Sequence, residues 1–398
     1  MEQAASRKRG IIYRVLTVIA LALIGTSFFA PGWWVSLTAP NYPEATFPQG
    51  IRILFHMDSV RNGCTIRESS EVEETEALDC VHEMDTINHY VGMYPIASGG
   101  PVEKAFSPFL FGMMGVMLLV FVAPGRKTRM AVSVLGYGAV AGWMGLAMYG
   151  TNGIQYHTTG YLEGLVVSLG QDTADKVDDQ NLSPIVKMLR QSLAESESAD
   201  VKAAEAAATA AEGEKGALIE NLRANYTIDE NKKHADEQVA WNGSIMQVFK
   251  WHYAKSLARW FNEPARNDPL VATMASVATV LFAVVIGFMA LMTFAAWSVR
   301  SPFYWLTVLV PMALPIGFLA EYAGWLWWYG HSLNSMGAFT LKPFMPTVFG
   351  DGKVAQFTTH SYPAIGFGMM VAAGLLLALA GLIRFKQVRL AGDAAAEM

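Results

Sequence analysis

Cysteine is almost absent from this sequence of 398 residues. The two that occur, Cys64 and Cys80, are too few for a disulfide scaffold or an iron–sulfur cluster. The motifs of covalent haem attachment (CxxCH), nucleotide binding (the Walker loop), serine hydrolases (GxSxG) and zinc proteases (HExxH) are also missing. The sequence therefore indicates no common enzyme class, and we expect a protein without catalytic activity.

Charged residues are scarce as well. They make up only 16% of the chain, whereas 53% of the residues are hydrophobic and are gathered in long segments. This composition is typical of membrane proteins, so we expect the lipid bilayer as a partner. The net charge of −5 comes mostly from acidic stretches outside the hydrophobic segments, which argues against nucleic-acid binding.

Six hydrophobic segments are long enough to cross a hydrocarbon core of roughly 30 Å, which takes about 20 helical residues. Three of them begin where a capping residue precedes a proline, whose missing amide costs nothing in the first turn of a helix. These starts are Ser107-Pro108, Asp268-Pro269 and Ser301-Pro302. We therefore expect an all-α fold, a transmembrane bundle of six helices. The expected spans are 11–30, 108–124, 130–149, 269–297, 303–326 and 363–384.

Lysine and arginine cluster at four places, which all fall on one side of the membrane if the six spans alternate. The positive-inside rule makes that side cytoplasmic. We expect a bacterial inner-membrane protein with both termini in the cytoplasm and its large loops in the periplasm. Segment 11–30 is expected to remain as an anchor, because Phe28-Phe29-Ala30 is a poor signal-peptide cleavage site. The clusters are Arg7-Lys8-Arg9, Arg126-Lys127 with Arg129, Arg300, and Arg384 with Lys386 and Arg389.

This threading divides the chain into alternating membrane and periplasmic parts. The two periplasmic loops at either end of the chain are expected to be ordered and to pack together over the bundle, whereas the middle one is a long helical insert. The expected parts are the anchor 1–30, the loop 31–107, the hairpin 108–149, the insert 150–268, the hairpin 269–326, the loop 327–362, and the last span with its tail, 363–398.

The insert contains a predicted helical hairpin. Ser183-Pro184 opens a helix that runs to about Gly213, and a second helical stretch near 217–224 turns back on it. We expect this hairpin to project outward, either as a solvated spacer or as an arm that docks a membrane or periplasmic protein through 184–240. Residues 244–261 mix aromatic and basic side chains and predict a helix that lies among the lipid headgroups.

The histidines all lie outside the expected spans, so we expect no haem bound between transmembrane helices. The periplasm is oxidising, so we expect Cys64 and Cys80 to form a disulfide. Directly after them, Asp79 predicts a helix start and Gly92 a helix stop. One face of this helix carries His82, Asp85 and His89, and the line continues past the glycine to Met93.

Imidazole and thioether groups together favour copper over zinc, because the soft sulfur of methionine suits Cu(I). Asp85 is a candidate acceptor that would fix the tautomer of a ligating histidine. An alternative remains open, since histidine and methionine at helical spacing also serve as packing residues, and the chain has 21 methionines. Further candidate ligands are His56, Met57, His331 and Met336.

Glu321 is the only carboxylate within an expected span, and it follows Pro311 and Pro315. Acids inside membranes are costly and usually have a function. Two interpretations stay open for Glu321: a functional role, or a side chain that reaches the nearby membrane surface.

Two groups of short motifs carry a family resemblance. APNYP and NHYVGM occur in the first outer loop, and GHSLN, KPFMPTVFG and SYP occur in the last one. Together they resemble an uncharacterised family of bacterial polytopic membrane proteins that is associated with copper-chaperone and nitrous-oxide-reductase accessory loci. The resemblance covers about half of the chain and leaves residues from about 170 to 265 without a counterpart. It implies copper handling, or assembly of a copper-dependent respiratory enzyme, and assigns that role to His89, Met93 and His331.

We therefore expect an accessory protein that binds or relays copper on the periplasmic side through His82, His89, Met93 and His331. Two other classes stay open. One is a structural subunit of a larger membrane complex, in which the hairpin docks a partner. The other is a transporter, which needs polar residues along a path through the spans, and Glu321 alone supports it. The oligomeric state and the partner are not indicated by the sequence.

Overall fold

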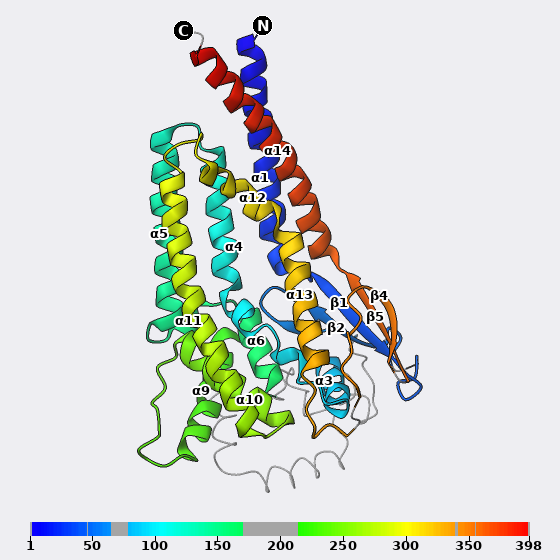
Figure 1. Cartoon of the computed structure of the whole chain (residues 1–398). Coiled ribbons are helices and arrows are strands. Elements are labelled where there is room, and N and C mark those ends of the chain that lie inside the picture. Colours follow the sequence, from blue (N-terminus) through cyan, green and yellow to red (C-terminus); the bar gives the residue numbers. More distant parts are fainter. Residues whose placement is uncertain are drawn as a thin grey trace.

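The computed structural model describes residues 2–45, 47–64, 79–169, 214–338, 341–354 and 356–396. Most of them form long helices that share one direction, and both chain termini lie at the same end of the molecule (Figure 1). We call this the termini end. The opposite end carries the β-strands and most of the short helices, and we call it the sheet end.

Five helices are long and apolar enough to cross a membrane, and a bent pair of helices brings the number to six if the pair is one span. The expectation of a multi-span helical bundle is thus confirmed for the described residues. The five helices are α1 (Glu2–Phe29), α4 (Pro101–Val122), α5 (Arg126–Tyr149), α11 (Pro264–Ala295) and α14 (Ile365–Ala396). The bent pair is α12 (Leu306–Met312) and α13 (Leu314–His331), which follow the short turn η3 (Pro302–Trp305).

The bend between α12 and α13 measures 60°. Two prolines cause it: Pro311 lies inside α12 and Pro315 lies in the first turn of α13, and neither can donate the amide that a continuous helix needs. Helix α14 packs against the break. A Cβ atom at Gly374 would be 3.0 Å from the carbonyl oxygen of Met312.

Two of the three predicted helix starts are wrong. Helix α4 begins at Pro101 and α11 at Pro264, so that Pro108 and Pro269 lie inside these helices. In α4 the neighbouring serine compensates: Pro108 cannot donate to the carbonyl oxygen of Lys104, and the Ser107 hydroxyl donates to it instead, at 3.0 Å. The third start is correct, since Ser301 is the N-cap of η3.

A small sheet corrects the all-α expectation. Its five strands are all antiparallel in the order β3-β2-β1-β5-β4. Strand β1 pairs with β5 from Trp33 opposite Pro363 to Thr38 opposite Thr358, which joins segment 31–107 to segment 327–362. The strands are β1 (Trp33–Thr38), β2 (Ile51–Phe55), β3 (Val60–Asn62), β4 (Gly350–Val354) and β5 (Phe357–Pro363).

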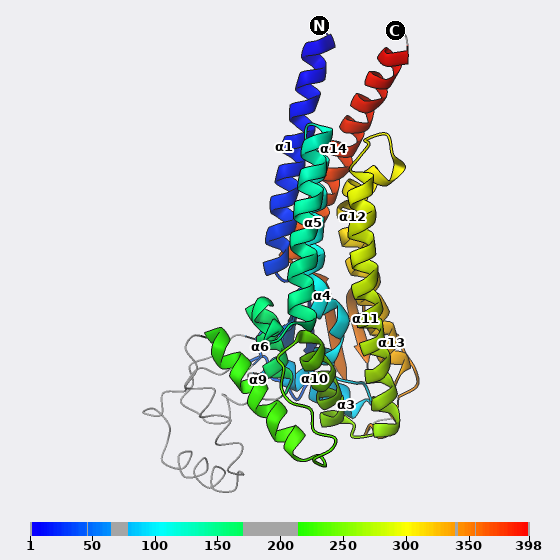
Figure 2. The same cartoon turned by 90° about the vertical axis from the view of Figure 1, so that its left-hand side faces the viewer.

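The remaining helices pack at the sheet end (Figure 2). They are α3 (Cys80–Tyr90), η1 (Ile96–Ser98), η2 (Gly153–Tyr156), α6 (Thr159–Ser168), α9 (Glu214–Asn231) and α10 (Ile245–Trp260). Two of these helices, α9 and α10, pack differently from what the sequence predicts for the insert. Helix α9 packs against α6 with Leu218 and Leu222 buried, so it is no free arm. Helix α10 buries its apolar residues inside the protein instead of among lipid headgroups, as Ile245 and Val248 show.

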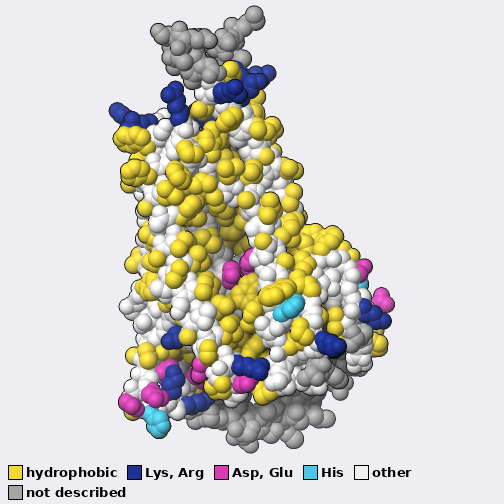
Figure 3. Space-filling model, in the orientation of Figure 1, with side chains coloured by type: hydrophobic (Ala, Val, Ile, Leu, Met, Phe, Trp, Pro, Cys, Tyr) yellow, Lys and Arg dark blue, Asp and Glu magenta, His cyan; other side chains and the backbone are white. Residues whose placement is uncertain are grey.

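The first part of the predicted hairpin, 183–213, lies outside the described residues. On the face that Figure 3 shows, hydrophobic side chains cover the bundle between the two ends, and lysine and arginine gather at the termini end. A hydrophobic belt of this kind fits a bilayer, which confirms the lipid bilayer as the surroundings of the bundle.

Candidate functional site

The NHYVGM sequence forms the C-terminal cap of α3. The amide of Gly92 donates to the carbonyl oxygen of His89 at 3.0 Å, and the amide of Met93 donates to that of Asn88 at 2.8 Å. This pair of bonds is a Schellman motif, which needs a left-handed residue, and Gly92 has φ 87°. The glycine therefore ends the helix and turns the chain between His89 and Met93.

The start of α3 is equally well fixed. The predicted cap is confirmed, because a carboxylate oxygen of Asp79 accepts from the amides of Val81 and His82, both at 3.1 Å. The expected disulfide between Cys64 and Cys80 is also present, with the two Cα atoms 6.0 Å apart. Both ends of α3 are thus fixed: the first by the Asp79 cap and the disulfide, and the second by the Schellman motif at Gly92.

The GHSLN loop packs directly on this turn. The amide of Asn334 donates to the carbonyl oxygen of Gly92 at 2.7 Å. The contact requires two glycines, because a Cβ atom at Gly92 would be 2.7 Å from the Asn334 carbonyl oxygen and one at Gly337 would be 2.5 Å from the Cα of Gly92. We call this contact between Gly92, Asn334 and Gly337 the loop junction. It brings the loops of segments 31–107 and 327–362 together.

His89 lies beside the loop junction in an aromatic setting. Its ring centroid is 4.7 Å from that of Phe261 and 5.6 Å from that of Trp260. Its Nδ1 atom is buried and has no hydrogen-bond partner among the described residues. Met93 is 4% exposed. A buried imidazole nitrogen without a partner and a buried thioether therefore occur on the same turn.

His82 has a different neighbour. Its Nδ1 atom is 3.2 Å from a guanidinium nitrogen of Arg259, and its ring packs on Trp260 with centroids 5.7 Å apart. The nitrogen accepts a hydrogen bond from a cation in this contact. A metal cation at the same nitrogen would have to displace Arg259, so His82 is a poor ligand.

His331 and Met336 belong to the last outer loop and are exposed. The Nδ1 atom of His331 is 2.8 Å from the carbonyl oxygen of Trp327, and the two rings stack with centroids 4.5 Å apart. Met336 is 51% exposed. Among the described residues, no hydrogen bond or ring contact joins either side chain to His89 or Met93.

His56 and Met57 form a second histidine–methionine pair, in the turn between β2 and β3. The Nδ1 atom of His56 is buried and also lacks a partner among the described residues. Burial lowers the pKa of His56 to about 4, with a smaller effect from Arg61. The methyl group of Met57 packs beside Gly32 and Phe318.

Asp85 binds backbone instead of an imidazole. It is 6% exposed, and its Oδ1 atom accepts from the amide of Ile96 at 2.7 Å. Lys104 holds the same turn, η1, by donating to the carbonyl oxygen of Ala97 at 2.6 Å. Burial raises the pKa of Asp85 to about 7. The sequence predicts that Asp85 accepts a hydrogen bond from a ligating histidine. In the structure it instead accepts from the backbone of the turn that joins α3 to α4.

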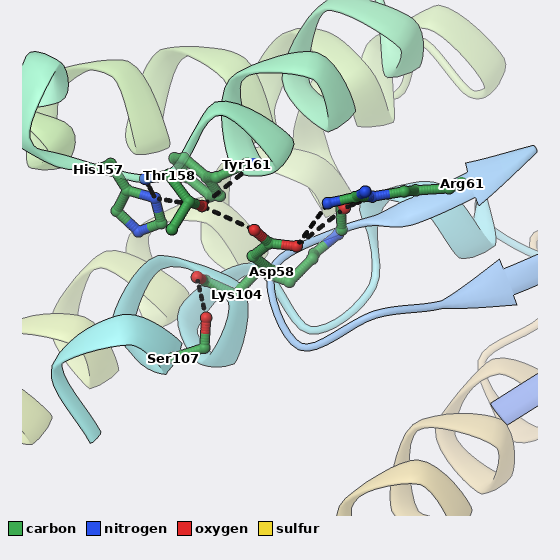
Figure 4. A network of polar contacts seen from close by, with 8 residues as sticks. Asp58, Arg61, Lys104, Ser107, His157, Thr158 and Tyr161 are labelled. Carbon is green, nitrogen blue, oxygen red and sulfur yellow. Dashed lines mark hydrogen bonds and ion pairs between the residues drawn. The ribbon is translucent and has the colours of Figure 1, made fainter. Parts of the chain in front are cut away.

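A buried polar network next to η1 was not expected from the sequence (Figure 4). Thr158 donates from its hydroxyl to Asp58 at 2.7 Å and from its amide to Nδ1 of His157 at 2.9 Å. The Nε2 atom of His157 is 3.1 Å from the carbonyl oxygen of Ala105 and acts as the donor. Burial lowers the pKa of His157 to about 4, so the imidazole is neutral. The network ties the β2–β3 turn to α6 and α4.

A cavity of about 30 Å³ adjoins this network. Polar side chains from the β2–β3 turn and four helices line it, among them Asp58, Ser98, Lys104, Ser168 and His252. The Nε2 atom of His252 is 2.8 Å from both the Ser168 hydroxyl and the Leu165 carbonyl oxygen, and burial lowers the pKa of this histidine to about 4. The volume suits one or two water molecules rather than an organic substrate.

Glu321 has a second acid as its neighbour. Because α4 begins earlier than expected, Glu103 also lies within a candidate span. A Cβ atom at Gly100 would be 3.5 Å from Glu321 Oε1 and 3.7 Å from Glu103 Oε2. The other oxygen of Glu103 accepts from the indole of Trp325 at 3.3 Å. The two acids and Lys104 therefore form one charged group at the sheet end of α4 and α13.

The expected ligands are thus divided among three places: the α3 cap, the β2–β3 turn and the last outer loop. Within the described ranges, no three histidine, cysteine, aspartate or glutamate side chains are placed to hold one metal ion. No known protein family, no curated protein and no solved structure matches this chain.

Proposed function

We propose that this chain is an accessory protein of the bacterial inner membrane that carries copper(I) at its sheet end, with His89 and Met93 as the ligands. Copper is the cargo in this proposal, either relayed to a partner or delivered during assembly of a copper-dependent respiratory enzyme. The observation that carries the proposal is the buried Nδ1 atom of His89, which has no hydrogen-bond partner among the described residues and lies on the same turn as the buried Met93.

The donor chemistry supports this choice. A neutral imidazole and a thioether are soft or intermediate ligands that suit Cu(I), whereas calcium and magnesium prefer oxygen donors. An imidazole nitrogen that is out of solvent and makes no hydrogen bond costs free energy, and a metal bond would offset that cost. The loop junction supports the geometry as well, because it fixes the turn that carries both ligands.

The proposed ligand set is smaller than the one that the sequence indicates. His82 is left out because of the guanidinium of Arg259. His331 and Met336 are left out because both side chains are exposed and His331 stacks on Trp327. His56 and Met57 carry the same donor types in the β2–β3 turn and are not part of the proposed ligand set.

The threading of the chain is part of the proposal. The loop junction faces the oxidising periplasm if the basic residues at the termini end are cytoplasmic. A disulfide between Cys64 and Cys80 fits that compartment. The resemblance of the NHYVGM and GHSLN motifs to a family associated with copper-chaperone loci belongs to the same proposal.

The competing classes receive less support. A docking arm at 184–240 would need a free hairpin, but α9 is buried against α6. A transporter would need polar side chains along the bundle, whereas the charged group of Glu103, Lys104 and Glu321 stays at the sheet end.

Copper content tests the proposal. The wild type and the double variant His89→Ala/Met93→Leu are incubated with Cu(I) in detergent, desalted and analysed for copper, and we expect bound copper in the wild type and its loss in the variant. The matched control is His331→Ala/Met336→Leu, which removes the same residue types from exposed positions and is expected to keep its copper. Equal copper in all three proteins would refute the proposal, as would a loss confined to the control.

A further inference from the structure

The termini end contains a group of arginines around two buried tyrosines. Arg129 of α5 is only 6% exposed, and its Nε atom donates to the carbonyl oxygen of Ala296 at 3.2 Å. Its guanidinium carbon is 5.8 Å from the centre of the Tyr304 ring. A nearly buried guanidinium with one backbone acceptor retains several unused N–H donors.

Arg384 of α14 approaches the same tyrosines from the other side. Its guanidinium carbon is 5.0 Å from the centre of the Tyr13 ring, and it lies beside the hydroxyl of Tyr304. One nitrogen donates to the side chain of Gln387 at 2.8 Å. The Nε atom is buried and has no hydrogen-bond partner among the residues that the structure describes. Arg384 and Arg129 are close enough to repel each other.

Among the described residues, no carboxylate forms an ion pair with these arginines. The sequence has no aspartate or glutamate in 3–43, 104–162, 269–320 or 352–392, which include the facing parts of all the helices at this end. The ion pairs between described residues belong instead to the sheet end. Converging cations without an anion are unfavourable, so the arrangement calls for an anionic ligand.

We propose that Arg129 and Arg384, which both lie beside Tyr304, bind the phosphate headgroup of an anionic phospholipid at the termini end. Guanidinium groups match phosphate oxygens with two parallel hydrogen bonds each. The position selects a lipid over a soluble anion, because the site lies at the ends of membrane helices, where headgroups are present at high local concentration. The site does not depend on the copper proposal.

Lipid-dependent stability tests the site. The full-length protein in a neutral detergent is melted with added phosphatidylglycerol, phosphatidylcholine or inorganic phosphate. We expect phosphatidylglycerol to raise the melting temperature of the wild type, and the other two to have little effect. The test variant is Arg129→Gln/Arg384→Gln, and the control is Lys127→Gln/Arg300→Gln, which removes two exposed cations from the same end.

The control is expected to keep the shift, and the test variant to lose it, with apparent lipid affinity reduced about tenfold or more for each guanidinium lost. If the double variant does not fold, Arg384→Gln alone serves, since Arg384 is less buried than Arg129. Equal shifts in test variant and control would overturn the proposal, because general charge attraction would then explain the effect. A full shift with inorganic phosphate would overturn the assignment to lipid.

Discussion

The amide of Asn334 donates a hydrogen bond of 2.7 Å to the carbonyl oxygen of Gly92, and this bond joins two loops that lie far apart in the sequence. The bond therefore connects the NHYVGM motif with the GHSLN motif. NHYVGM ends a helix with a left-handed glycine, and GHSLN covers that glycine. The loop junction holds the turn between His89 and Met93 in place, and the proposed copper site depends on it.

Replacement of Gly92 by alanine should disrupt the loop junction. An alanine at φ 87° is strained, and its Cβ atom would be 2.7 Å from the Asn334 carbonyl oxygen. We expect Gly92→Ala to lower the free energy of unfolding by about 1–3 kcal/mol, measured by thermal or chemical unfolding in detergent. The matched control is Gly138→Ala, where no atom lies within 4 Å of the added Cβ. Equal stability of the two variants would contradict the structural role of Gly92.

The disulfide between Cys64 and Cys80 should stabilise α3 at its N-terminus. The bond closes a loop with a sequence separation of 16, for which the chain-entropy model gives about 3 kcal/mol. We expect Cys64→Ser/Cys80→Ser to lower unfolding stability by about that amount, and a reductant to have the same effect on the wild type only. An unfolding curve of the wild type that a reductant leaves unchanged would show that the bond does not stabilise the fold.

Two buried groups should give opposite pH dependences of stability. Burial raises the pKa of Asp85 from 3.8 to about 7, so the folded state binds an extra proton between these values and stability falls as the pH rises through this window. Burial lowers the pKa of His252 from 6.5 to about 4, so the unfolded state binds the extra proton and stability falls as the pH drops through that window.

Unfolding free energies measured between about pH 4 and pH 8 check both signs. Relative to the wild type, Asp85→Asn should gain stability steadily as the pH rises to about 7, and His252→Gln should gain it as the pH falls from 6.5. A difference from the wild type that stays constant over the whole range, for either variant, would mean that the residue does not titrate as its burial requires.

Two tyrosines in the bundle allow a matched comparison of one hydroxyl group. The hydroxyl of Tyr137 is buried without a hydrogen-bond partner among the described residues, whereas that of Tyr304 donates to the carbonyl oxygen of Phe121 at 3.1 Å. We expect Tyr137→Phe to stabilise the protein by about 1 kcal/mol and Tyr304→Phe to destabilise it by about the same amount. Destabilisation by both substitutions would show that Tyr137 has a partner, such as a buried water.

The sequence was sufficient for the membrane helices, because each depends on local composition. Hydropathy located all the candidate spans, although it placed the starts of α4 and α11 too late. The error has the same cause in both helices: the sequence predicts Pro108 and Pro269 in the first turn, but both lie inside a helix, and in α4 the Ser107 hydroxyl supplies the missing donor. The prolines 311 and 315 were visible in the sequence, but the bend of 60° that they cause was not predicted.

The sheet was not predicted because its pairing is non-local. Strand β1 takes β5 as a neighbour across almost the whole chain, and β4 (GDGKV) and β5 (FTTHSYP) lack the apolar alternation that marks a half-buried strand. Only the spatial proximity of the two loops shows that these segments pair.

The sequence predicted those features of the candidate site that depend on a single continuous segment. Asp79 and Gly92 bound α3 as the sequence indicates, and the disulfide is present. The network of Asp58, His157 and Lys104 was missed because its members come from separate segments without a shared spacing. A single lysine at the start of an apolar helix was the one available signal.

X-ray absorption at the copper edge tests the central claim, that His89 and Met93 bind copper(I) together. The wild type loaded with Cu(I) should show both nitrogen and sulfur neighbours around the metal. His89→Ala should weaken the nitrogen contribution, and Met93→Leu should remove the sulfur one. A metal environment that neither substitution changes would contradict the claim.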